Sequence, residues 1–147
     1  MLRETLTPDL VTTDLPGIDK ASVVRALLHM LVRTGKVKDP DLALKDLLDH
    51  EGEMSTGMEN GIAIPHVKTD AVEELLACVG VSRRKIDFES LDRKPSRIFI
   101  MTLSPQGTGG PHVRFLADIS RLLREPRIRR QVLKARTDAQ LFEMLTR

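Results

Sequence analysis

The sequence predicts an α/β or α+β fold in which helices cover a small β-sheet. Apolar residues recur at helical spacing over residues 19–34, and helical spacing returns after residue 111. Between them, residues 75–82 and 97–103 are short, apolar and rich in β-branched side chains, as strands are. The 147 residues are 41% hydrophobic and 30% charged, which is ordinary for a soluble globular domain, so we expect a single domain over residues 1–147.

The N-terminal third combines an extended segment with two helices. Apolar residues alternate near the N-terminus, which indicates an extended segment or an edge strand before the Pro16-Gly17 turn. In residues 19–34 the apolar side chains fall on one helical face, and the glycine that follows is a typical helix end. Asp39-Pro40, a capping residue followed by proline, starts a second helix that reaches about His50.

The middle of the chain supplies the sheet. Residues 51–60 are rich in Gly, Ser, Thr and Asn, which predicts a loop. Residues 61–64 then form a short strand that Pro65 ends, and the two apolar segments named above are the strongest strand candidates. Residues 104–111 contain three glycines and two prolines, so another loop is expected there.

Three helices are expected after this loop. The first has two apolar stripes, which predicts burial over a wide arc; they comprise Val113, Leu116, Ala117, Ser120 and Leu123, and Phe115, Ile119 and Leu122. Pro126 starts the second helix. Thr137 and Gln140 match a capping box at the start of the third.

The composition excludes several classes of protein. No apolar run approaches the roughly 18 residues of a membrane span, and the N-terminus lacks an apolar secretory core. The single cysteine, Cys78, excludes an intramolecular disulfide framework and favours the reducing cytoplasm. Aromatic residues are only 3% of the chain, which argues against stacking platforms for single-stranded nucleic acid.

Positive charge is concentrated at the C-terminal end. Residues 121–147 carry eight basic and three acidic side chains, whereas the whole chain has a net charge of only +2. Three interpretations are open: a solvated helix face, a surface for an acidic protein partner, or a nucleic-acid site. Of these, we expect no nucleic-acid partner.

Among the four histidines, His66 has the most constrained setting. It directly follows the apolar run Gly-Ile-Ala-Ile-Pro, which gives it a rigid seat. The hydroxyl groups and Gly-permitted backbone N–H groups just upstream, in residues 55–61, are suited to surround an anion. The residues alone leave three interpretations of His66 open: a functional imidazole, a structural histidine or a metal ligand.

The other histidines differ from His66. His112 lies at a helix N-terminus after a Gly-rich loop, where the helix dipole favours an anion and keeps an imidazole neutral. His50 ends a helix, and His29 reads as an ordinary helix residue. His50, His66 and His112 are 16 and 46 residues apart, which matches no compact metal-ligand spacing, so no metal is expected.

One segment resembles a known signature. Ser55-Thr56-Gly57 is followed, two residues later, by the run Asn60-Gly61-Ile62-Ala63-Ile64-Pro65-His66. This pattern resembles the active-site signature of the IIA (EIIA) components of the bacterial sugar phosphotransferase system, PTS. The class is the fructose/mannitol or type-2 class, which includes the nitrogen-regulatory IIA proteins. Residues 86–95, 98–105 and 112–120 resemble later segments of that family in order, and the resemblance covers roughly residues 4–146.

The resemblance implies a mixed central β-sheet flanked by helices and a phosphotransferase role. His66 would carry the phosphoryl group as phosphohistidine, and His112 would be the second active-site histidine, in contact with that group. Thr56, Asn60 and Gly61 would lie in the loop around the phosphate and bind it. The chain would contain one EIIA domain, without a fused permease or IIB module.

One departure from the family concerns His50. The family carries Arg-Glu shortly before Ser-Thr, whereas this sequence has His50-Glu51. Arginine is a permanent, bidentate phosphate partner, whereas histidine is charged only part of the time near neutral pH. Either His50 substitutes weakly as a phosphate-binding residue, or the protein has moved toward regulation.

Two functions therefore remain open. The first is a phosphocarrier that accepts its phosphoryl group from a histidine phosphocarrier protein of the HPr or NPr type and passes it to a IIB partner. The second is a nitrogen-type regulatory module whose phosphorylation state controls a protein partner. The sequence contains no nucleotide-binding glycine motif, and neither function requires a cofactor, a metal or membrane insertion.

Overall fold

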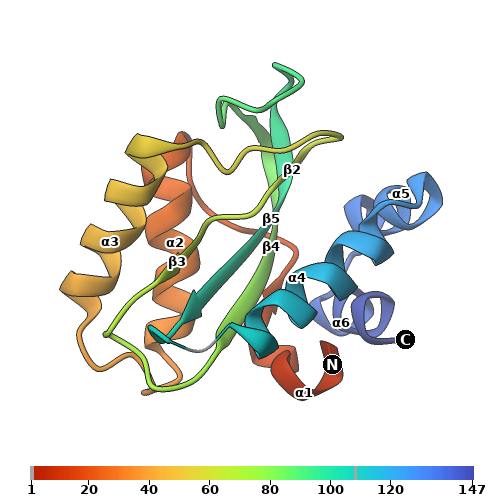
Figure 1. The fold of residues 1–147 in the computed structure, drawn as a ribbon. Helices are drawn as coiled ribbons and strands as arrows, with labels where there is room; N and C mark the ends of the chain where they lie inside the picture. The colour runs from red at the N-terminus through yellow and green to blue at the C-terminus, as the bar shows by residue number, and fades with distance from the viewer. Residues whose placement is uncertain (1, 108) are drawn as a thin grey trace.

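A five-stranded mixed sheet lies at the centre of the molecule (Figure 1). The computed structural model describes residues 2–107 and 109–147, so Met1 of the expected domain and Thr108 of the expected loop lie outside it. The strand order is β1-β4-β5-β2, and β3 also pairs with β5. The strands are β1 (Val11–Thr12), β2 (Ile62–Ala63), β3 (His66–Lys68), β4 (Leu76–Ile86) and β5 (Ser96–Ser104).

The sheet is mixed because only its central pair is antiparallel. Strands β4 and β5 run antiparallel, whereas β1 runs parallel to β4, and β2 and β3 run parallel to β5. Both long strands are almost fully buried over their apolar segments, as their continuous apolar sequences predict. The mixed sheet flanked by helices confirms the expected architecture.

Strands β2 and β3 occupy the same edge of β5 with a break between them. Ala63 pairs with Phe99 and His66 pairs with Thr102. The break falls at Pro65, which has no backbone N–H to give to a ladder, although its carbonyl still accepts from the Thr102 N–H at 3.1 Å. Because the chain resumes pairing immediately, the proline does not end the strand region as predicted, and His66 begins β3.

Two helices cover one face of the sheet (Figure 1). Helix α2 (Lys20–Val32) starts at Asp19, whose side chain accepts from the Ser22 N–H, and packs against β4 and helix α3. Helix α3 (Pro40–Glu53) continues past the predicted end, because Gly52 lies inside its last turn and the Met54 N–H bonds to the His50 carbonyl. The predicted loop from residue 51 therefore begins only after residue 53.

The other face carries the C-terminal helices and the start of the chain (Figure 1). They are α4 (Gly110–Leu123), α5 (Pro126–Lys134) and α6 (Asp138–Thr146), with α1 (Leu2–Thr5) and a short 3₁₀ helix, η1 (Pro8–Leu10). The N-terminal segment was expected to be extended, which is right for β1 at the sheet edge and wrong for α1 and η1. Thr137 caps α6 as predicted, accepting from the Gln140 N–H at 3.1 Å.

Helix α4 is buried along one stripe only, so the predicted wide arc is wrong. Its buried residues are His112, Phe115, Ile119 and Leu123, while Val113 is 64% exposed and Ala117 and Ser120 are also exposed. The stripe of residues 112, 115, 119 and 123 follows helical spacing, so a single face packs inward.

The core between the layers is aliphatic with a few large rings. Phe88 and Phe99 are fully buried, and their ring centroids lie 5.4 Å apart. Cys78 on β4 is also fully buried, and burial raises the pKa of its thiol far above the ordinary range. Within the described residues, every helix is too short or too polar to span a bilayer.

Candidate functional site

Three imidazole rings from three separate elements meet at one end of the β3 edge. His50 comes from the last turn of α3, His66 from the start of β3 and His112 from the first turn of α4. The ring centroids of His50 and His66 lie 5.1 Å apart, and those of His66 and His112 lie 5.9 Å apart. His66 is therefore the central ring, and the helix termini that carry the other two converge on it.

The ring of His66 is held by its own backbone. Its Nδ1 lies 2.6 Å from the carbonyl oxygen of Ile64. A carbonyl can only accept a hydrogen bond, so Nδ1 carries the proton and donates. In the neutral ring Nε2 then keeps its lone pair, and this is the tautomer that a nucleophile needs.

His112 is held through its other nitrogen. Its Nε2 lies 2.9 Å from the hydroxyl of Thr102, and both side chains are buried. Burial lowers the pKa of His112 below the ordinary 6.5, and the charges of His66 and Lys68 lower it further. His112 is therefore neutral at neutral pH, and only Nδ1 is left to contact a bound group.

Thr56 lies on a hairpin that leads directly to His66. The Met58 N–H donates to the Ile62 carbonyl, and the Ile64 N–H donates to the Thr56 carbonyl at 3.0 Å. Gly57 fits where a side chain could not, because a Cβ there would lie 2.6 Å from the Phe88 carbonyl oxygen. Thr56 therefore lies across the hairpin from Ile64, and Ile64 is two residues before His66.

Asn60 and Gly61 form the turn of this hairpin. Both have positive φ angles, 63° and 76°, and the Ile62 N–H bonds to the Glu59 carbonyl, as in a type I′ turn. Asp92 Oδ2 accepts from the Asn60 N–H at 3.0 Å, and this bond, after that from the Lys94 N–H, lowers the pKa of Asp92.

The turn does not join the histidine cluster. Ile62 pairs with Ile98 on β5, whereas His66 pairs with Thr102, four residues further along. Four residues of strand span about 13 Å. The structure thus brings together His50, His66 and His112 with Thr56 nearby, but it places Asn60 and Gly61 at the far end of the hairpin.

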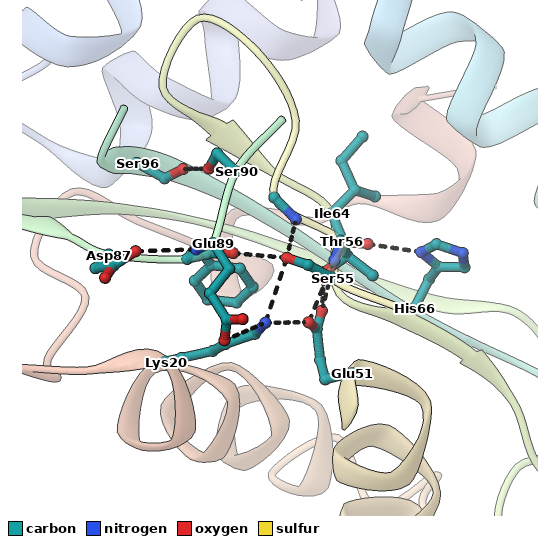
Figure 2. Close-up of polar contacts among 12 residues, drawn as sticks. Lys20, Glu51, Ser55, Thr56, Ile64, His66, Asp87, Glu89, Ser90 and Ser96 are labelled. Atoms are coloured by element: carbon teal, nitrogen blue, oxygen red, sulfur yellow. Dashed lines mark hydrogen bonds and ion pairs between the residues drawn. The ribbon is translucent and has the colours of Figure 1, made fainter. Parts of the chain in front are cut away.

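Sequence reasoning missed a charged pair behind Thr56. The carboxylate of Glu51 accepts from the Thr56 N–H and hydroxyl, and the Lys20 ammonium lies 2.8 Å from Glu51 Oε2 (Figure 2). Glu51 was assigned to a loop, and Lys20 lies 31 positions earlier in the sequence. Had the helix been extended through Gly52, Glu51 would have been predicted on the same helical turn as His50 and not in a loop.

The site suits an anionic group better than a metal ion. Among residues 2–107 and 109–147, no three His, Cys, Asp or Glu side chains are arranged to hold a metal. One nitrogen of His66 and one of His112 are already engaged by Ile64 and Thr102. What remains is an imidazole with a defined nucleophilic nitrogen, next to two further rings that can donate hydrogen bonds.

Comparison with known proteins identifies the family of the chain. Residues 4–147 match the family described as "Phosphoenolpyruvate-dependent sugar phosphotransferase system, EIIA 2". The chain is 37% identical over 142 residues to the PTS system fructose-specific EIIA component of Haloferax volcanii, covering 96% of this chain and 92% of that protein. It is 33% identical over 136 residues to the nitrogen regulatory protein of Bradyrhizobium diazoefficiens, covering 90% of this chain and 88% of that protein.

Solved structures share the fold. The nitrogen regulatory protein IIA-Ntr of Neisseria meningitidis superposes with a TM-score of 0.89 at 22% identity, covering 97% of each chain. A complex of enzyme IIA mannitol with phosphorylated enzyme IIB mannitol from Escherichia coli superposes with a TM-score of 0.81 at 16% identity, covering 96% of each chain. The family match and the two sequence relatives each cover most of this chain, so it belongs to the EIIA 2 family of the phosphoenolpyruvate-dependent sugar phosphotransferase system.

Proposed function

We propose that His66 carries the phosphoryl group of this PTS protein, taking it from a phosphohistidine carrier of the HPr or NPr type and passing it to a partner. The observation that carries the proposal is the hydrogen bond from His66 Nδ1 to the Ile64 carbonyl, with Nε2 left as the nucleophile in a cluster of imidazoles. EIIA components carry phosphoryl groups as a family, which supports assigning that task to this ring.

In the proposed step, the lone pair of Nε2 attacks phosphorus while the bond from phosphorus to the donor histidine breaks. The departing nitrogen keeps the electron pair of that bond. The His66 ring gains positive charge as the new N–P bond forms, and Nδ1–H shares this charge with the Ile64 carbonyl, so the existing hydrogen bond strengthens in the transition state. No proton needs to leave His66 for the transfer.

The neighbouring residues have distinct proposed roles. His112 donates from Nδ1 to a phosphoryl oxygen, and His50 supplies a second contact in the position where the family carries arginine. Thr56 holds the hairpin next to the site. Asn60 and Gly61 act through the turn that shapes this hairpin, in place of the direct phosphate contact that was expected of them.

The next acceptor defines two versions of the function. The E. coli IIA mannitol neighbour is in complex with a phosphorylated IIB protein, which supports a IIB partner for this chain. The nitrogen regulatory relative supports the second version, in which the phosphorylation state of His66 controls a regulated protein. The first version is the one that the more similar fructose-specific relative favours.

The central test is phosphorylation in a reconstituted system. The chain is incubated with ³²P-labelled phosphoenolpyruvate, Enzyme I and the phosphocarrier protein, and acid-labile label is counted. We expect label on the wild type, none on His66→Ala and full label on the control His29→Ala, since His29 is exposed and lies outside the cluster. Unlabelled wild type, or undiminished label on His66→Ala, would reject the proposal.

The two versions are separated by partner capture. Purified IIB should remove label from the phosphorylated chain if the transport version holds. In the regulatory version, His66→Ala and a phosphomimetic His66→Asp should capture different partner proteins. Identical partners and affinities for these two variants would rule out the regulatory version.

A further inference from the structure

A buried ion pair lies behind the hairpin that leads to His66. Lys20 Nζ lies 2.8 Å from Glu51 Oε2, and the two side chains are only 18% and 5% exposed. Lys20 is the first residue of α2, where the helix dipole disfavours a cation. Its ammonium is also packed 5.1 Å from the centroid of the Phe88 ring. A buried ion pair is by itself weak evidence that the fold is stabilised, so we asked which residues the pair keeps in place.

The pair holds the two residues that open the hairpin. Both carboxylate oxygens of Glu51 lie 3.2 Å from the Thr56 nitrogen, and the Thr56 hydroxyl donates to the same carboxylate. Lys20 Nζ donates to Ser55 Oγ at 3.3 Å. Ser55 Oγ in turn donates to the Phe88 carbonyl at 2.6 Å (Figure 2). The start of the hairpin is thereby fixed to α2 and α3.

Two further hydrogen bonds connect this anchored segment to the His66 ring. The Thr56 carbonyl accepts from the Ile64 N–H at 3.0 Å. The Ile64 carbonyl accepts from His66 Nδ1 at 2.6 Å. Figure 2 shows the series running from Glu51 through Thr56 and Ile64 to His66. Ile64, whose carbonyl selects the tautomer of His66, is therefore held by Thr56, which Glu51 anchors.

We propose that Lys20 and Glu51 are positioning residues that fix the orientation and the Nδ1–H tautomer of His66. Neither residue touches His66. Lys20 orients the Glu51 carboxylate, Glu51 orients Thr56, and Thr56 sets where the Ile64 carbonyl lies. The consequence for phosphoryl transfer rests on the proposed function of His66, whereas the consequence for the tautomer does not.

The test measures the tautomer directly by ¹⁵N NMR of the histidine side chains. The wild type is compared with Glu51→Gln, which keeps the size of the side chain but removes the charge, and with Lys20→Met. Thr56→Val keeps both ionic partners and removes only the hydroxyl donor. Lys45→Met is the matched control, because it also removes a lysine paired with a carboxylate of α3, but both side chains of the Lys45–Asp49 pair are exposed.

We expect His66 to be predominantly the Nδ1–H tautomer in the wild type and in Lys45→Met. In Glu51→Gln, Lys20→Met and Thr56→Val, the fraction of His66 in the Nε2–H tautomer should increase. In the phosphorylation assay, the rate at saturating phosphocarrier should fall by about 10- to 100-fold while the apparent KM for the carrier stays within twofold, as expected for misplacement of a reacting group. Lys20→Arg, which keeps the positive charge, should recover most of both signals.

The outcomes are separable. A wild-type tautomer ratio in folded Glu51→Gln and Thr56→Val overturns the positioning proposal, whatever the phosphorylation assay gives. Far-UV circular dichroism and the dispersion of the amide spectrum establish that each variant is folded. If the wild type takes no label on His66, the proposed function fails, and the NMR comparison still decides whether Lys20 and Glu51 set the ring.

Discussion

His66 and His112 lie side by side but are held in opposite ways. His66 donates from Nδ1 to a backbone carbonyl, which accepts only, so its tautomer is imposed by the chain. His112 uses Nε2 with the Thr102 hydroxyl, which can donate or accept. His66 is partly exposed, whereas His112 is 7% exposed. One ring is thus fixed in protonation pattern and accessible, and the other is buried and adaptable.

The difference fits two different tasks. A nucleophile must present one defined lone pair to its substrate, and a rigid carbonyl partner gives that definition. A group that contacts phosphate oxygens before and after transfer benefits from a partner that can reverse its hydrogen bond. The burial that keeps His112 neutral also keeps a second positive charge away from the ring of His66.

The largest expected effect comes from variants that replace one nitrogen of His112 at a time. Glutamine at 112 can still reach Thr102 but places no group at the Nδ1 position, whereas asparagine does the reverse. Removing one positioned hydrogen-bond donor slows catalysis by about 10²- to 10³-fold, so His112→Gln should lose this much in phosphoryl acceptance and His112→Asn clearly less. Rapid-quench measurement of label uptake checks this, and equal losses would contradict the assignment of Nδ1 to the phosphoryl group.

The next effect concerns the partner of His112. Thr102→Val keeps the shape of the side chain but leaves Nε2 of a buried histidine without its hydroxyl partner. An unsatisfied buried polar group costs about 1–3 kcal/mol, and the free energy of unfolding should fall by this amount. Urea denaturation followed by circular dichroism measures it. A change below about 0.5 kcal/mol, the usual range of neutral surface substitutions, would mean that the hydroxyl does not support the ring.

A smaller change is expected from His50. Arginine there would give a permanent charge and a bidentate contact with the phosphoryl oxygens, which a single imidazole does not provide. We expect His50→Arg to accelerate phosphoryl acceptance by about tenfold, equivalent to about 1.4 kcal/mol. The rate of label uptake relative to the wild type is the measurement. A slower variant would show that the site is built around the imidazole.

The smallest effect is the pH dependence of stability that His112 causes. Its pKa is lowered in the folded protein, so below the unfolded value of about 6.5 the unfolded chain binds more protons. The free energy of unfolding should therefore decrease as the pH falls through 6.5, until the lower folded pKa is reached. Urea titrations between pH 7.5 and 5 should show a shallower decrease for His112→Asn than for the wild type. Parallel curves would contradict the lowered pKa.

The fold could be predicted where a local pattern was strong. Helix α2 was found from its apolar face, and the glycine predicted to stop it, Gly35 with a φ of 77°, lies just beyond its end at Val32. The buried strands β4 and β5 were found from continuous apolar residues. Strand β3 was missed, because three residues after a proline carry no periodic signal of their own and are defined only by pairing with β5.

The site was predictable in part for the same reason. His66 and His112 were identified by their local settings and by the family signature. The approach of His50 to His66 depends on how α3 packs against β3, and the Lys20–Glu51 pair depends on how α2 packs against α3. Such contacts join residues far apart in sequence, so no local pattern contains them. The loop around Asn60 was correctly predicted, but its separation from His66 was not.

The burial of Cys78 has a practical consequence. It is the only cysteine in the chain, it is fully buried, and its thiolate is strongly disfavoured. Since the thiolate is the reactive form, a thiol-specific alkylating reagent can modify Cys78 only when β4 becomes exposed. The rate of alkylation therefore reports how often the central sheet opens, and no residue has to be changed to measure it. The same inert thiol leaves any cysteine introduced on the surface as the one position that a label will find.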